Sequence, residues 1–144
     1  MAFTYRFLDD VAIADLAFEA VGDSPQDLFY GATQALLESL ADPLSVAAVW
    51  ERHVSAADSD LSNLLFDWLS LVVYWKDAAG VVFCEAPLVL TCDSGIWTLQ
   101  GRLIGAPVNQ QTQELRNDVK GITKHLYDLT QYESEWKARV VLDV

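Results

Sequence analysis

Apolar side chains recur at helical spacing in two segments of the chain, which predicts two helices. In GDSPQDLFYGATQALLESLAD, Ser24 can cap the first turn and Pro25 fits the first helical position. The apolar stripe that follows consists of Phe29, Ala32, Leu36 and Leu40. The second segment runs from Asp60 to about Lys76, ends near Gly80, and carries on one side Leu61, Leu64, Leu65, Trp68, Leu69 and Val72. Each helix is therefore expected to bury one face in a core.

The remaining segments show the alternation or the short apolar runs of β-strands, bounded by turn residues. Residues 3–20 predict two strands with a turn at Asp9 and Asp10, and residues 45–54 predict another strand before a polar loop, AADSD. The later β segments are VVFCEAPLVLTC, IWTLQGRLIG, VKGITKHLYDLTQY and WKARVVLDV. Two helices among six to eight strands, without regular alternation, predict an α+β fold with helices packed on mixed or antiparallel sheets.

Residues 1–144 are expected to form one domain, because a chain of this length with 52% apolar residues can bury one core. No repeat, low-complexity run or linker divides it. The longest apolar stretches, such as LSLVVYW, fall well short of the roughly 20 residues that a membrane-spanning helix needs. The start, MAFTYRF, lacks the blocks of a secretory signal. We therefore expect a soluble cytoplasmic protein with no membrane partner.

The two cysteines, Cys84 and Cys92, fall in one strand-like run. Eight extended residues would separate them by roughly 26 Å, too far for a disulfide unless the strand folds back. Both are therefore expected to be reduced thiols in the core.

The net charge of −12 narrows the class of partner. Nine Lys and Arg residues stand against 21 Asp and Glu residues, and the basic residues form no cluster. Because nucleic acids are bound through patches of Lys and Arg, direct nucleic-acid binding is not expected. An acidic surface suits a metal cation or a basic protein partner.

Local motifs of enzymes are absent, since the chain has no GxGxxG, GxxxxGK[ST], GxSxG or CxxC. The stretch Asp58-Ser59-Asp60 begins like a calcium loop but lacks its glycine and its closing glutamate. His53 and His125 lie far apart in the sequence without an obvious third ligand. The chain is not expected to be an enzyme.

Three carboxylates adjoin apolar strand residues at opposite ends of the chain. Asp15 has apolar neighbours on both faces of its strand, and Asp143 and the free carboxylate of Val144 close another apolar strand. A buried carboxylate is costly unless it is hydrogen-bonded, paired or bound to a cation, although a place at a strand end in contact with water would explain Asp15 alone. Three such oxygen donors could share one hard divalent cation, with Ca²⁺ the first choice and Mg²⁺ or Mn²⁺ as alternatives.

Several segments occur in an order and spacing that resemble one known family. They are Ala14-Asp15 followed by Gly22-Asp23-Ser24 and Asp27-Leu28-Phe29, then Leu64-Leu65-Phe66-Asp67-Trp68-Leu69, Gly80-Val81-Val82-Phe83, Val119-Lys120-Gly121-Ile122-Thr123-Lys124-His125, and Trp136 to Val144. Together they cover almost the whole chain, which in this respect resembles the archease family.

The resemblance implies an accessory protein of RtcB-type RNA ligases, which join RNA ends in tRNA splicing and RNA repair with GTP and a metal. Such a protein would promote guanylation and turnover of the ligase, and would not itself be an enzyme. The resemblance also implies a metal site made by Asp15, Asp143 and Val144, and candidate ligase contacts at Lys120 and His125.

The chain departs from the family pattern at several positions. The family usually has Asp-His-Thr-Ala-Asp where this chain has Val11-Ala12-Ile13-Ala14-Asp15, so only the last two residues agree. Lys124 stands in place of Tyr, and Gly121 in place of Ala. If the missing polar groups help to hold the ion or the ligase, affinity or mechanism would differ in this chain.

Two other functions are considered. One is a general chaperone-like interaction module in which the divalent cation is only structural, and for which an aromatic content of 11% could supply an exposed patch. The other is a hydrolase with Asp15 and Asp143 as an acid and base pair, which no substrate-orienting motif supports.

Overall fold

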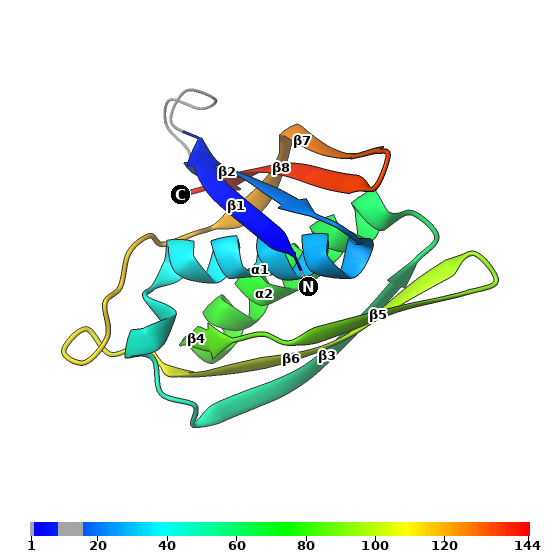
Figure 1. The fold of residues 1–144 in the computed structure, drawn as a ribbon. Helices are drawn as coiled ribbons and strands as arrows, with labels where there is room; N and C mark the ends of the chain where they lie inside the picture. The colour runs from blue at the N-terminus through cyan, green and yellow to red at the C-terminus, as the bar shows by residue number, and fades with distance from the viewer. Residues whose placement is uncertain (1, 9–15) are drawn as a thin grey trace.

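Residues 2–8 and 16–144, the part of the chain described here by a computed structural model, form two α-helices and eight strands in two antiparallel sheets (Figure 1). In order, the elements are β1 (Phe3–Leu8), β2 (Leu16–Gly22), α1 (Pro25–Leu40), the 3₁₀ turn η1 (Pro43–Ser45), β3 (Trp50–Asp58), α2 (Leu61–Ala79), β4 (Val81–Glu85), β5 (Leu88–Asp93), β6 (Ile96–Pro107), β7 (Gly121–Tyr132) and β8 (Glu135–Asp143). The predicted α+β fold class is confirmed.

Capping residues mark the start of both helices and the end of α2. Ser24 caps α1, because its hydroxyl accepts a hydrogen bond from the Asp27 N–H at 3.1 Å. Asp60 caps α2 through the N–H groups of its first turn, and Gly80 ends α2 in the left-handed conformation with φ of 64°. The carboxylate of Asp60 is therefore a helix cap and not part of a calcium loop.

A membrane-crossing helix would have to be longer or more apolar than either helix in the described residues.

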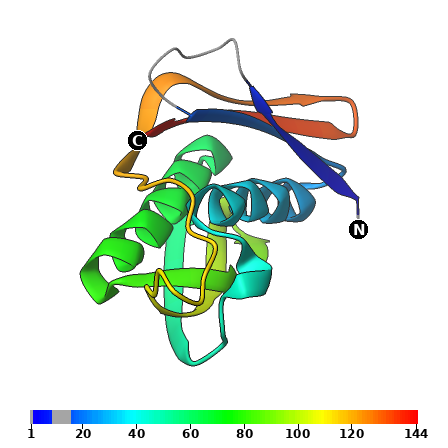
Figure 2. The same cartoon turned by 90° about the vertical axis from the view of Figure 1, so that its left-hand side faces the viewer.

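The helices lie between the two sheets (Figures 1 and 2). The first sheet has the strand order β1-β2-β8-β7, and the second has the order β3-β6-β4, with β5 also paired to β6. Helix α1 contacts β1, β2 and β8 on one side and β4 and β5 on the other, whereas α2 contacts β7 on one side and β3, β4 and β6 on the other. A single buried cluster accordingly contains residues from both sheets and both helices.

Trp68 of α2 is fully buried within this cluster. Its indole N–H donates a hydrogen bond to Thr33 Oγ1 of α1 at 2.8 Å, and that hydroxyl donates to Phe29 O at 2.6 Å. Gly101 of β6 lies against the ring, since a Cβ atom there would come within 2.5 Å of Trp68 Cη2. The large side chain thus ties the two helices to the second sheet.

The strand predicted over residues 45–54 is misplaced. It runs over Trp50–Asp58 and includes the first residues of the stretch that the sequence analysis assigned to a loop. Asp42 and Pro43 start the 3₁₀ turn instead, where the Asp42 carboxylate accepts from the Leu44 N–H at 3.0 Å. The strand begins later because its partner β6 supplies a backbone pair for every residue from Trp50 to Asp58.

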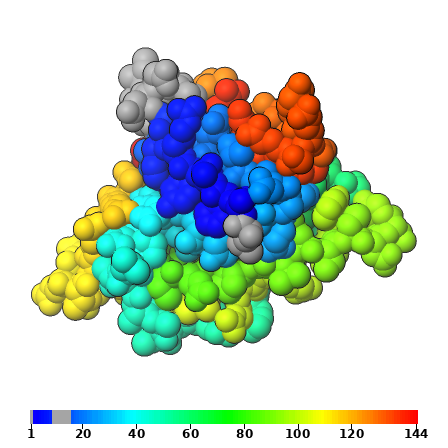
Figure 3. Space-filling model, in the orientation of Figure 1, coloured from blue at the N-terminus to red at the C-terminus, as the bar shows by residue number. Residues whose placement is uncertain are grey.

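Both cysteines are free thiols, as predicted, but neither is in the core. Cys84 is half-buried in β4 and Cys92 is exposed in β5. The predicted single strand is interrupted at Ala86 and Pro87, so the two cysteines belong to different strands. Burial raises the pKa of the Cys84 thiol. Cys92 lies near the turn of the β5–β6 hairpin, whose end projects beyond the helices and leaves it uncovered (Figures 1 and 3).

The free edge of β5 is occupied by one side chain of α1. The amide of Gln26 donates to Leu88 O at 2.6 Å and accepts from the Leu90 N–H at 2.8 Å. They are two of the backbone groups with which another strand would pair.

Candidate metal centre

The end of β8, which carries Asp143, is paired with β2 on one side and with β7 on the other. On one side Leu16 of β2 pairs with Leu142, and on the other Gly121 of β7 pairs with Asp143. The C-terminus accordingly lies beside the start of β2 (Figure 1). Leu142 is fully buried, whereas Asp143 and Val144 are exposed. The two carboxylates of Asp143 and Val144 therefore stand at the boundary between core and solvent.

Asp15, the third predicted ligand, lies outside the described residues. It is bonded to Leu16, and Leu16 is paired with the residue before Asp143. The metal site of Asp15, Asp143 and Val144 therefore stays a prediction.

The described residues alone do not complete a metal site. Across residues 2–8 and 16–144, no group of three His, Cys, Asp or Glu side chains is arranged to hold a metal ion. Asp143 and the carboxylate of Val144 are hard oxygen donors, which suit Ca²⁺ or Mg²⁺ better than a soft metal. A third donor from residue 15 would give the set expected from the sequence.

The surroundings of Asp143 leave one buried oxygen without a partner. Val140 and Leu142 face the helices, so Val141 and Asp143 face the other side of the sheet. Thr123 pairs with Val141 on the neighbouring strand, and its Oγ1 is buried without a hydrogen-bond partner among the described residues. An unsatisfied hydroxyl on the same side of the sheet is compatible with a polar group or ion at this place.

Lys120, predicted as a ligase contact, adjoins Asp143. Its backbone N–H donates to Asp143 O at 2.7 Å, and its side chain is exposed. Gly121, where the family pattern has Ala, pairs with Asp143, and a Cβ atom built there would meet nothing within 4 Å. The glycine is therefore not required by packing in this chain.

His125, the other predicted contact, is exposed in an irregular part of β7. The pairing of β7 with β8 shifts between Thr123 and Asp128, and Leu126 has a positive φ of 56°. Tyr127 holds this part of the strand on α2 by donating to Ser62 O at 2.6 Å, and burial raises the pKa of its hydroxyl. The structure thus brings Lys120, but not His125, into hydrogen-bond contact with Asp143.

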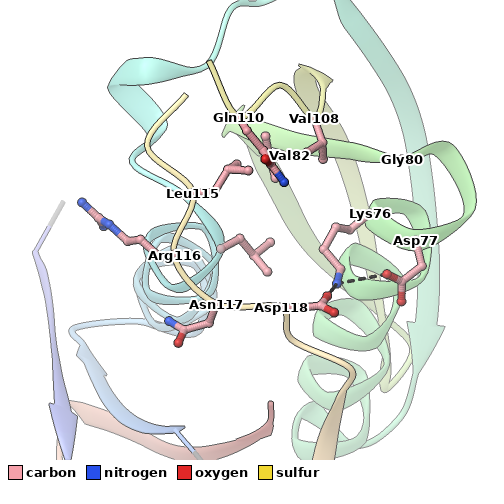
Figure 4. A pocket seen from close by; sticks show the side chains of 11 residues that line it. Lys76, Asp77, Gly80, Val82, Val108, Gln110, Leu115, Arg116, Asn117 and Asp118 are labelled. Carbon is pink, nitrogen blue, oxygen red and sulfur yellow. Dashed lines mark hydrogen bonds and ion pairs between the residues drawn. The ribbon is translucent and has the colours of Figure 1, made fainter. Parts of the chain in front are cut away.

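A buried lysine near this end of the sheet was not predicted from the sequence. Lys76, in the last turn of α2, is only 8% exposed, and its Nζ donates to Asp118 Oδ1 at 2.9 Å and to Val119 O at 2.6 Å. It also forms an ion pair with Asp77 at 3.0 Å (Figure 4). The signal in the sequence was a single cation within a strongly apolar helix, which is unfavourable to bury unless acceptors lie nearby.

The pocket in Figure 4 lies beside Lys76 and does not include Asp143, Val144 or Lys120. Its volume is about 430 Å³. Its apolar lining consists of Leu40, Val82, Val108 and Leu115, and its polar lining includes Arg116, Asn117 and Asp118. Arg116 is held by Glu38 and Glu114, each at 2.6 Å, so it is already paired.

Comparison with known proteins gives a consistent result over the whole described fold. The family model of the Archease protein family matches residues 5–144. The protein archease of Methanothermobacter thermautotrophicus is 29% identical over 140 residues, covering 97% of this chain and 98% of the relative. The protein archease of Methanosarcina barkeri is 26% identical over 141 residues, covering 97% and 95%.

Solved structures agree with the sequence relatives. The solution structure of Methanobacterium thermoautotrophicum protein 1598 superimposes with a TM-score of 0.79 at 28% identity, covering 97% of this chain and 98% of that one. The crystal structure of an archease from Thermotoga maritima, described as a possible chaperone, has a TM-score of 0.62 at 20% identity and covers 92% and 93%, which supports the fold. From the family match over residues 5–144 and these relatives, we conclude that this chain belongs to the archease family.

Proposed function

We propose that this protein is a metal-dependent accessory protein of an RtcB-type RNA ligase, and that it promotes guanylation and turnover of the ligase in tRNA splicing and RNA repair. The observation that carries the proposal is the pairing of β8 with β2 and β7. Leu142, the residue before Asp143, pairs with Leu16, and the Lys120 N–H donates to Asp143 O. Membership of the archease family supports the same function.

Asp15, Asp143 and Val144 would hold a divalent cation, with Ca²⁺ preferred over Mg²⁺ or Mn²⁺. The bound cation would supply the positive charge that allows three carboxylates to lie close together at the edge of an apolar core. The exposure of Asp143 leaves this site open to a partner. Lys120, which precedes β7, and His125, within β7, are both exposed and are proposed as contacts of the ligase. The net charge of −12 suits a ligase with a basic docking surface.

Ligand removal gives the first test. In a guanylation assay with the cognate ligase, Asp15→Ala and Asp143→Ala are expected to lower activation at least about tenfold, because each removes one oxygen ligand. Asp128→Ala is the matched control, since Asp128 is an exposed acid on the same sheet. Equal activation by all variants would remove the site assignment, and no activation by the wild type would remove the proposed function.

The carboxylate of Val144 can be tested separately by extending the chain. A tag joined after Val144 converts this carboxylate into an amide, so the affinity for Ca²⁺ is expected to fall at least about tenfold. Calorimetry with Ca²⁺, Mg²⁺ and Mn²⁺ on tagged and untagged protein measures the change. The same tag at the N-terminus serves as the control, and identical affinities for the two tagged proteins would contradict the role of Val144.

A chaperone-like interaction module is the second candidate function. Several exposed apolar side chains favour it, among them Leu44 at 95% and Tyr132 at 75% exposure. The Thermotoga maritima archease is described as a possible chaperone. This function would be preferred if chelation lowered the melting temperature while ligase activation persisted in the folded protein.

A further inference from the structure

The peptide group between Val119 and Lys120 is hydrogen-bonded on both sides. Its carbonyl, Val119 O, accepts from Lys76 Nζ at 2.6 Å. Its N–H, on Lys120, donates to Asp143 O at 2.7 Å. One peptide group therefore joins a buried ammonium in α2 to the last residue of β8.

Lys76 is well fixed at its end of this connection. Lys76 Nζ donates hydrogen bonds to Val119 O at 2.6 Å and to Asp118 Oδ1 at 2.9 Å, and it forms an ion pair with Asp77 Oδ1 at 3.0 Å. Figure 4 shows the contacts with Asp118 and Asp77. The hydrogen bond from Lys76 also lowers the pKa of the Asp118 carboxyl. The two hydrogen bonds from this buried cation restrain Asp118 Oδ1 and Val119 O.

The segment before Lys120 is also held on the other helix. The backbone N–H groups of Arg116 and Asn117 donate to Leu40 O and Ser39 O of α1, both at 3.0 Å. The side chain of Val119 is fully buried. The Val119–Lys120 peptide group is thus positioned by α1, by α2 and by the core. Its N–H, which donates a hydrogen bond to Asp143 O, is held in place as a result.

We propose that Lys76 is a positioning residue for the carboxylates of Asp143 and Val144, acting through the Val119–Lys120 peptide group. The positive charge polarises this group, so its N–H becomes a better donor to Asp143 O. Anchoring Asp143 O restricts rotation of the peptide group between Asp143 and Val144, and so restrains the backbone from which both carboxylates extend. A metal site depends on such restriction, because its ligands must be held within narrow limits. This inference rests on the proposed cation site.

A purely structural role for Lys76 makes a different prediction. In that case its replacement would lower stability but leave the Ca²⁺ affinity of the folded protein unchanged. With a positioning role, the affinity falls even at temperatures far below the unfolding midpoint. The NMR shift and the hydrogen-exchange rate of the Lys120 amide also change, because this amide belongs to the peptide group that Lys76 contacts.

The test compares Lys76→Met with Lys137→Met, which removes an exposed lysine from β8. Calorimetry with Ca²⁺ is expected to show about tenfold weaker binding for Lys76→Met and no change for Lys137→Met. NMR spectra are expected to show a shifted and faster-exchanging Lys120 amide in Lys76→Met only. A folded Lys76→Met protein with the wild-type Ca²⁺ affinity would overturn the proposal, whether or not the Lys120 amide shifts.

A second variant keeps the test informative if Lys76→Met does not fold. Asp118 is largely exposed, at 83%, so Asp118→Asn is expected to fold and to loosen Lys76 with smaller changes in the same direction. If Asp118→Asn leaves both the Lys120 amide and the Ca²⁺ affinity unchanged, the proposal is wrong. If the wild type binds no Ca²⁺, the metal site fails, and the amide readout then decides separately whether Lys76 positions Asp143.

Discussion

Replacing Trp68 with alanine is expected to lower the free energy of unfolding by about 3–5 kcal/mol. The side chain is fully buried between the helices and β6, so its loss leaves a cavity bounded by elements that cannot all move inward. The change also leaves the buried hydroxyl of Thr33 without the indole donor. Because domains of this size are stable by only about 5–15 kcal/mol, the variant should unfold at a much lower denaturant concentration.

Chemical denaturation followed by circular dichroism measures this effect. Tyr74→Ala is the matched control, since Tyr74 is an aromatic residue of the same helix that is 58% exposed, and it should cost far less. Trp68→Phe restores most of the volume without the N–H donor, and is expected to fall between the two. Similar losses for Trp68→Ala and Tyr74→Ala would mean that Trp68 does not connect the two helices with the second sheet.

Gly105→Ala is expected to lower the free energy of unfolding by about 3 kcal/mol through overpacking. A methyl group at this position of β6 would overlap the backbone oxygen of Val82 and lie 2.9 Å from Phe83 Cα. Both atoms belong to the backbone of β4, which pairs with β6 here, so relief requires the strands to separate.

Gly121→Ala provides the comparison for this effect. A methyl group there meets no atom within 4 Å, so stability is expected to change by less than about 0.5 kcal/mol. Thermal unfolding of both variants gives the two values. Equal losses would show that the cost at Gly105 comes from the conformational preference of glycine and not from the close approach of β4.

Local signals in the sequence were sufficient for the two helices. The cap at Ser24, the apolar periodicity and the glycine at position 80 each act within a few residues, and the structure contains both helices near the expected bounds. The start of β3 could not be obtained in this way, because the length of its partner β6 decides it. Pro87 did carry a local signal for the break between β4 and β5, which the continuous apolar run obscured.

The candidate site depends on contacts between distant parts of the chain. Periodicity cannot show that β2 and β8 are neighbours, and the expectation that Asp15 and Asp143 meet came from their unusual apolar surroundings and from the family resemblance. Lys76 was missed for a related reason. A cation in the last turn of a helix is ordinary, since it complements the helix dipole, and only the position of Asp118 and Val119 distinguishes it.

The side chain of Gln26 affects how copies of this protein meet in a concentrated solution. A strand with an unpaired edge can pair with a strand of a neighbouring molecule, which is a common route to fibrous aggregates. Here an incoming backbone would first have to displace an amide that already satisfies Leu88 and Leu90. The glutamine therefore makes strand addition at Leu88 and Leu90 less favourable.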